Sequence, residues 1–170
     1  MRKLLYTFVI MVGMLTASQA QFADHVKVLD IKVNNSKVLA GSLSEGRYID
    51  LRFGLRGSVN CFTEVQKKYF NGHHVLYAFE VPANTKVLVE LTTKGDMSLY
   101  GYMIDKSRYD IPPYLENVSK SGCSSSAKPM GELDRIMLKA GSSPTHVVVG
   151  VTGIDEADQG AFNLKIVTRE

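Results

Sequence analysis

The chain has 170 residues, of which 45% are hydrophobic and 22% charged, a composition typical of a folded globular protein. Its 20 Lys and Arg against 17 Asp and Glu give a net charge of +3, or 18 against 17 without Arg2 and Lys3, which excludes a dedicated nucleic-acid-binding protein. The length suits one domain, and two cysteines are too few for an all-cysteine zinc site or a dense disulfide scaffold.

The first twenty residues have the pattern of an export signal. A short basic start precedes a nearly unbroken apolar run from Leu4 to Leu15. Ser18 and Ala20 are both small and stand two positions apart, which predicts cleavage after Ala20. The apolar run is short for a bilayer span, so a retained anchor is the weaker alternative. We expect a signal peptide over residues 1–20 and a secreted or periplasmic protein without a transmembrane span.

Alternating apolar and polar residues predict short strands throughout residues 21–170. In chain order, the predicted strands cover residues 26–33, 49–55, 75–81, 87–91, 97–104, 133–138, 147–151 and 162–166. Turn-forming residues, such as Asn34-Asn35-Ser36, separate these runs. Many short strands at regular spacing predict a single all-β domain, an antiparallel β-sandwich. The spacing of Cys61, Val65 and Tyr69 after Asn60 fits either one short helix or a loop.

Cys61 and Cys123 are the two cysteines of the chain. In an oxidising compartment, two thiols most simply form a disulfide. Because 61 residues separate them, closing this loop is expected to stabilise the fold by about 4 kcal/mol in the chain-entropy model. The alternative is two free thiols, one of them catalytic, but no neighbouring histidine or basic residue activates either one. We therefore predict a Cys61–Cys123 disulfide.

Tyrosines gather in and after the predicted strand 97–104. Tyr100 and Tyr102 share one face of this strand, and Tyr109 and Tyr114 follow in a long polar connection over residues 106–128, interpreted as a surface loop. Exposed tyrosines stack on sugar rings or anchor protein partners, which makes Tyr102, Tyr109 and Tyr114 candidate ligand-binding residues. The alternative is that Tyr100 and Tyr102 pack inside the sandwich.

Two clusters contain metal-ligating residue types. Asp155, Glu156 and Asp158 place three carboxylates within four residues, and Ca²⁺ prefers such oxygen ligands, so we consider a calcium site there. The alternative is an ordinary acidic surface turn, since the regular alternation of a dedicated calcium loop is missing. His73 and His74 point to opposite faces if they lie on a strand, so they could share a metal only in a loop. Solvated loop histidines are the simpler interpretation.

Three motifs in order resemble a known family of secreted domains. The stretch from Val75 to Leu91, VLYAFEVPANTKVLVEL, resembles the opening of a bacterial pre-peptidase C-terminal domain. Gly95-Asp96-Met97-Ser98-Leu99-Tyr100 resembles the Gly-Asp-x-Asp-Leu-Tyr motif of that family, with Ser98 in place of the second Asp. Residues 147–153 and 160–166 resemble its closing pair of strands. The resemblance covers about residues 70–167 and implies a jelly-roll-like β-sandwich that is not itself catalytic and binds substrates or surfaces.

Familiar catalytic motifs are missing from the sequence. The patterns Gly-x-Ser-x-Gly, His-Glu-x-x-His and Gly-x-x-x-x-Gly-Lys do not occur. Together with the resemblance, this predicts a secreted, non-catalytic module that binds a polysaccharide or a cell-surface protein, with no cofactor other than the calcium considered above. Two alternatives remain open: an accessory or inhibitory subunit of a secreted hydrolase, and a small hydrolase with an unrecognised site.

Overall fold

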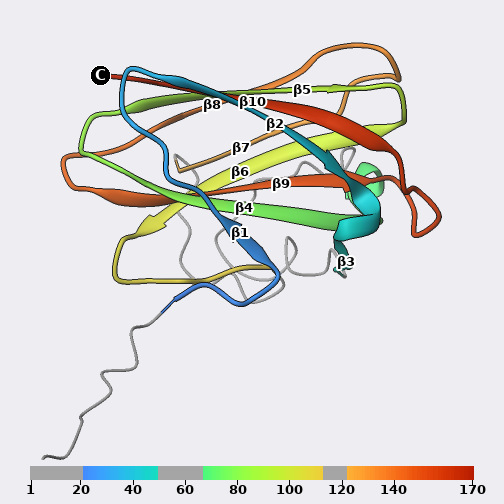
Figure 1. The fold of residues 1–170 in the computed structure, drawn as a ribbon, viewed down its shortest axis with the longest axis horizontal. Coiled ribbons are helices and arrows are strands. Elements are labelled where there is room, and N and C mark those ends of the chain that lie inside the picture. Colours follow the sequence, from blue (N-terminus) through green and yellow to red (C-terminus); the bar gives the residue numbers. More distant parts are fainter. Residues whose placement is uncertain (1–20, 50–66, 113–121) are drawn as a thin grey trace, which may run out of the picture.

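The computed structural model describes residues 21–49, 67–112 and 122–170, which form two β-sheets lying face to face (Figure 1). Sheet A has the strand order β1-β4-β9-β6-β7, and β3 also pairs with β4. Its strands are β1 (Val26–Val28), β3 (Arg47–Tyr48), β4 (His73–Val81), β6 (Met97–Asp105), β7 (Cys123–Ser126) and β9 (Thr145–Gly153). Sheet B has the order β2-β10-β5-β8, formed by β2 (Ser36–Ser42), β5 (Lys86–Thr93), β8 (Asp134–Lys139) and β10 (Ala161–Arg169). The predicted all-β sandwich is confirmed.

The main core lies between the two sheets and follows the alternation of the strands. From sheet B, every second residue of β5, β8 and β10 points inward, including Val89, Ile136 and Leu164, which are buried. From sheet A, Val149 and Leu99 meet them in the same cluster. Because side chains of a strand alternate between its two faces, the other residues of β5, β8 and β10 form the outer face of sheet B.

Sheet A is buried on both of its faces. Its outer face carries a second apolar cluster in which Leu76 and Val148 pack with Phe22, Val26 and Phe70. The chain segments before β1 and after β6 pass over this side of the sheet (Figure 1). This arrangement explains why β4, β6 and β9 are buried almost without interruption rather than at alternate positions.

A glycine allows one of the close contacts in this second cluster. A Cβ atom built on Gly150 of β9 would lie only 2.1 Å from Cζ of Tyr100, which is opposite Gly150 on the neighbouring strand. Any side chain at position 150 would therefore displace the tyrosine ring. Gly150 fixes the place of Tyr100 on the outer face of sheet A.

Several sequence predictions differ in detail from the structure. The early strand predicted over residues 26–33 is shorter, because β1 ends at Val28, and it pairs parallel with β4 rather than antiparallel. β2 was not predicted, and β7 lies within the connection that we interpreted as a loop. Most of the candidate helix at 61–69 lies outside the described residues, and its last residues, Lys67–Tyr69, form a 3-10 turn. A second 3-10 turn covers Leu43–Glu45. Among the described residues, no helix has the length and hydropathy of a membrane span.

Candidate functional site: the outer face of sheet B

The predicted tyrosine site is not formed at the surface. Tyr102 is only 1% exposed, and its hydroxyl donates to the backbone oxygen of Asp110 at 3.0 Å. The assignment of Tyr102 as a ligand-binding residue is therefore wrong, because the segment after β6 packs over its ring. Tyr109 is half-buried, and its ring lies 5.1 Å from the rings of Phe22 and His146. Tyr114 lies outside the described residues.

Tyr100 is equally buried and is held by a histidine. Its hydroxyl lies 2.8 Å from Nδ1 of His74, and Nε2 of His74 lies 3.2 Å from the backbone oxygen of Phe70. Since a carbonyl oxygen only accepts, Nε2 carries the imidazole proton and Nδ1 accepts from the tyrosine. Burial lowers the pKa of His74 to about 3 and raises the pKa of Tyr100 above its usual range. His74 and Tyr100 are therefore both neutral, and the hydrogen bond between them holds the tyrosine in place within the second cluster.

Two carboxylates of the acidic turn accept hydrogen bonds from the backbone of the same turn. The Asp158 carboxylate accepts from the backbone N–H groups of Ile154 at 2.7 Å and Asp155 at 3.2 Å. The Asp155 carboxylate accepts from the N–H of Ala157 at 2.8 Å. No group of three metal-ligating side chains with suitable geometry occurs within residues 21–49, 67–112 and 122–170. Two of the three carboxylates thus cap their own turn, and the calcium site at Asp155, Glu156 and Asp158 stays a prediction.

The histidine pair lies in a strand, and one of the two cysteines opens another. His73 and His74 lie in β4 and thus point to opposite faces, as expected for a strand. Cys123 opens β7 and does not carry a free thiol. Cys61 lies outside the described residues, so the Cys61–Cys123 pairing stays a prediction.

The outer face of sheet B remains open, in contrast to sheet A. No described segment of the chain packs over it, and it includes two of the most exposed large apolar side chains, Val38 at 64% and Met137 at 67%. Strand pairing aligns its residues in rows that run across the strands. Its charged residues are one anion, Glu90, and five cations, Lys86, Arg135, Lys139, Lys165 and Arg169. The face is therefore strongly basic, although the whole chain is close to neutral.

One row of this face is internally neutralised. Glu90 on the central strand β5 lies opposite Lys165 on one side and Arg135 on the other. Its carboxylate contacts the Arg135 guanidinium at 2.5 Å and Nζ of Lys165 at 3.4 Å. These cations hold the pKa of Glu90 below its ordinary value. We call these three residues the paired row.

The row nearest the end of β10 has no anion. Arg169 lies opposite Lys86, and Lys86 lies opposite Lys139, all with exposed side chains. Among the described residues no carboxylate forms an ion pair with any of the three. We call them the basic row. Between the two charged rows lies an apolar row of Val167, Leu88 and Met137.

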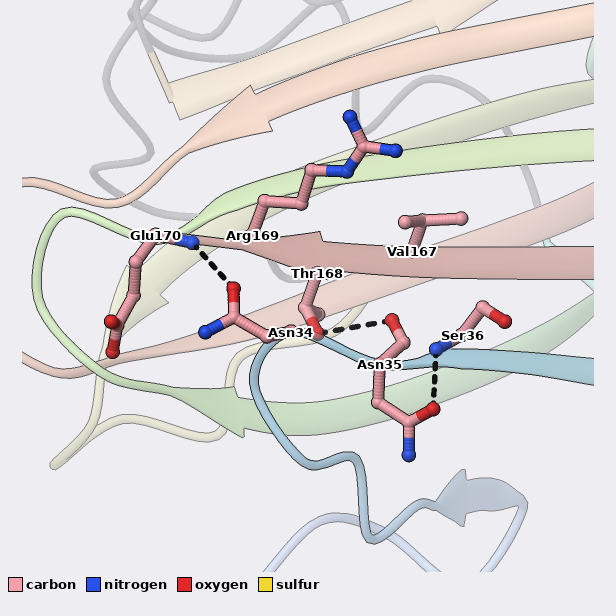
Figure 2. A pocket seen from close by; sticks show the side chains of 7 residues that line it. All are labelled: Asn34, Asn35, Ser36, Val167, Thr168, Arg169 and Glu170. Atoms are coloured by element: carbon pink, nitrogen blue, oxygen red, sulfur yellow. Dashed lines mark hydrogen bonds between the residues drawn. The ribbon is translucent and has the colours of Figure 1, made fainter.

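A shallow depression of about 460 Å³ adjoins the basic row at the start of β2 (Figure 2). It is lined by Asn34, Asn35, Ser36, the last residues of β10 and Glu170, the acidic residue that follows Arg169, and Val167 and Arg169 lie on the same side of β10. The side-chain oxygen of Asn34 accepts from the N–H of Glu170 at 3.2 Å, and that of Asn35 accepts from the N–H of Ser36 at 2.7 Å. The amide NH₂ groups of both asparagines are left to donate to a ligand.

The cations of this face escaped the sequence analysis, although a signal for them exists. The outward positions of β5, β8 and β10 each show charged, apolar and charged residues in turn. The three runs are Lys86-Leu88-Glu90, Arg135-Met137-Lys139 and Lys165-Val167-Arg169. Only the strand order and register bring the three runs side by side.

Comparison with known proteins gives remote structural similarities. No family model matches this chain, and no curated protein matches it by sequence. A periplasmic inhibitor of g-type lysozyme from Aeromonas hydrophila has a TM-score of 0.45 at 12% identity, covering 86% of this chain and 99% of that one. The pre-peptidase C-terminal domain of a Bacillus anthracis collagenase has a TM-score of 0.40 at 12% identity, covering 88% and 99%. The corresponding lysozyme inhibitor from Salmonella Typhimurium has a TM-score of 0.44 at 12% identity, covering 86% and 99%. We assign the chain to no family on these similarities, and the pre-peptidase C-terminal resemblance stays a prediction.

Proposed function

We propose that this chain is an exported, non-catalytic binding module, and that its ligand, an extracellular polysaccharide or surface protein, lies on the outer face of sheet B. The observation that carries the proposal is the contrast between the two sheets. Sheet A is covered on its outer face by described segments of the chain, whereas the outer face of sheet B exposes Val38 and Met137. Exposed apolar side chains grouped with charged ones are typical of interaction surfaces.

The buried polar groups of the described residues support a non-catalytic role. His74 and Tyr100 form a hydrogen bond within an apolar cluster. Asp134, whose pKa is raised by burial, accepts from Ser126 Oγ at 2.7 Å and from the N–H of Lys128 at 3.0 Å, which ties β8 to β7. These contacts give His74, Tyr100 and Asp134 structural roles within the fold.

The experiment that tests this proposal measures retention of residues 21–170 on insoluble polysaccharides and on cell-wall fractions. The test variant replaces Val38 and Met137 by Ser, which removes exposed apolar surface from the face without altering the core. If each side chain contributes about 1 kcal/mol to binding when covered, retention should fall about thirtyfold. The matched control replaces Val28 and Tyr48 by Ser, because these side chains are 66% and 52% exposed on the strands of sheet A.

The two variants separate the outcomes. Loss of retention in the Val38/Met137 variant, with normal retention in the Val28/Tyr48 control, would support the binding module and locate its ligand on the outer face of sheet B. Equal retention of both variants on every bound polymer would refute the assignment of the face. Turnover of a substrate panel by the isolated chain would instead favour the small hydrolase considered from the sequence. Copurification with one enzyme whose rate it alters would favour the accessory subunit.

A further inference from the structure

We propose that the outer face of sheet B selects an acidic polysaccharide, whose carboxylate or sulfate groups lie along the basic row of Lys86, Lys139 and Arg169. This inference rests on the function proposed above and adds the charge class of the ligand. The arrangement of the face carries it: an uncompensated row of cations, an apolar row beside it and a depression with free amide donors at its end.

The basic row is unfavourable for the isolated protein. Directly opposed residues of adjacent antiparallel strands have Cβ atoms about 5 Å apart, and like charges in such pairs destabilise a sheet. Lys86 faces a cation on both sides, Arg169 on β10 and Lys139 on β8. A ligand with negative charges spaced along the row would relieve this repulsion. The energetic gain on binding is therefore larger than for three isolated surface cations.

The paired row provides an internal comparison. It has the same geometry four residues away on each strand, but the central position is Glu90 rather than lysine. There the carboxylate occupies the place between Arg135 and Lys165 and contacts both. The same sheet thus shows how a carboxylate is held between two cations in this geometry. In the basic row, we expect a ligand carboxylate or sulfate to take the corresponding place beside Lys86.

The apolar row and the depression suit a sugar polymer. Val167, Leu88 and Met137 lie directly beside the basic row, so the C–H faces of sugar rings can pack on them while the charged groups reach the cations. The NH₂ groups of Asn34 and Asn35 at the edge of the depression can donate to hydroxyl or carboxylate oxygens. The strands place successive cations about 4.8 Å apart, which is comparable with the length of one sugar unit.

An acidic protein fits this face less well. Protein interfaces concentrate their binding energy in aromatic and arginine side chains that fill pockets. The outward positions of β2, β5, β8 and β10 contain no Phe, Tyr or Trp. A regular row of cations instead matches an extended polymer with regularly repeated charges.

The test compares two polymers that differ only in charge. Binding of residues 21–170 is measured to polygalacturonate and to its methyl ester, which keeps the sugar backbone but loses the carboxylates. Alginate and chondroitin sulfate extend the acidic panel, and each titration is repeated at raised salt. The test variant is Lys86→Gln, Lys139→Gln and Arg169→Gln. The control variant, Arg47→Gln, Lys94→Gln and Lys128→Gln, removes three exposed cations from elsewhere on the protein and has the same net charge.

We expect the unaltered protein to bind at least one acidic polymer, to bind the methyl ester more weakly, and to lose affinity as salt screens the charges. If each cation contributes about threefold, which is within the range of exposed ion pairs, the test variant should bind about thirtyfold more weakly. The control variant should stay within about threefold of the unaltered protein. Both variants alter exposed side chains, and unchanged thermal unfolding would confirm that they fold.

Failure of this inference is distinguishable from failure of the proposed function. Equal binding of polygalacturonate and its methyl ester, with no effect of the test variant, would refute the acidic ligand and leave the binding face in place. Absence of binding to all acidic polymers, or an equal loss in both variants, would also refute it. Binding of a protein ligand that is abolished in the test variant would refute the assignment of a polysaccharide as the ligand of this face. The proposed function is judged separately by the Val38/Met137 variant and its control.

Discussion

Acidification should destabilise this protein through His74, whose imidazole is buried against Tyr100 and the Phe70 carbonyl. Burial lowers the pKa of His74 from its ordinary 6.5 to about 3 in the folded protein. Between these two values the unfolded chain binds a proton at this site and the folded protein does not. Stability from this group is therefore complete above pH 6.5 and is lost as the pH falls toward 3.

The magnitude follows from the two pKa values. Linkage between about 6.5 and about 3 gives a loss of about 2 to 3 kcal/mol when the pH falls from about 7.5 to about 4.5. Such a loss is a large fraction of the free energy of unfolding of a typical domain, which is about 5–15 kcal/mol. Carboxylates with lowered pKa values, such as Glu90 and Asp105, also lose their contribution to stability as the pH falls. Their share must be subtracted from the measured loss before the rest is assigned to His74.

The assay is urea unfolding at these two pH values for the unaltered protein and for His74→Gln. Glutamine can retain a hydrogen bond to Tyr100 but does not titrate, so the variant should lose about 2 kcal/mol less on acidification. Tyr100→Phe keeps the imidazole and removes its partner, and should lower stability by about 1 kcal/mol at neutral pH while keeping the acid sensitivity. An identical loss on acidification in the unaltered protein and in His74→Gln would refute the reasoning.

Three further predictions concern the second cluster, the acidic turn and the paired row. Gly150→Ala should destabilise by about 3 kcal/mol in urea unfolding, because its Cβ would overlap the Tyr100 ring, whereas Gly141→Ala, with open space around it, should be nearly neutral. Asp158→Asn should lower stability by about 1 kcal/mol, and calcium against chelator should leave the melting temperature of the unaltered protein unchanged; a rise with calcium would instead support the predicted calcium site. Glu90→Gln should strengthen binding of polygalacturonate about threefold by freeing Arg135 and Lys165, and weaker binding would contradict the electrostatic account.

Alternation in the sequence predicted the strands that later proved central. The runs at 75–81, 87–91, 97–104, 147–151 and 162–166 lie within observed strands of the sandwich, and the run at 133–138 overlaps β8 from Asp134 onward. The predicted strand at 49–55 lies outside the described residues apart from Ile49, which is buried in the second cluster. β2 was missed because Lys37, Gly41 and small polar residues weaken its apolar alternation. β7 was missed because Cys123-Ser-Ser-Ser126 has no hydrophobic pattern.

The candidate site shows where sequence reasoning ended. Tyr102 and Lys86 both occupy strand positions, but the tyrosine is buried and the lysine is exposed. Nothing local distinguishes a strand with one covered face from a strand with two. The coverage of sheet A depends on Phe22, Phe70 and Ile111, which are distant from Tyr102 in the chain or separated from it by a loop.

By itself, the sequence determined the alternation of side chains and therefore which residues of β5, β8 and β10 share a face. This property is local, because successive side chains of a strand point in opposite directions. The tertiary structure decided which strands are neighbours and in which register, and so placed Arg169 beside Lys86 and Lys86 beside Lys139. It also decided that sheet A is covered and sheet B is open. Both outcomes follow from burial of apolar surface between segments far apart in the chain, which no local pattern records.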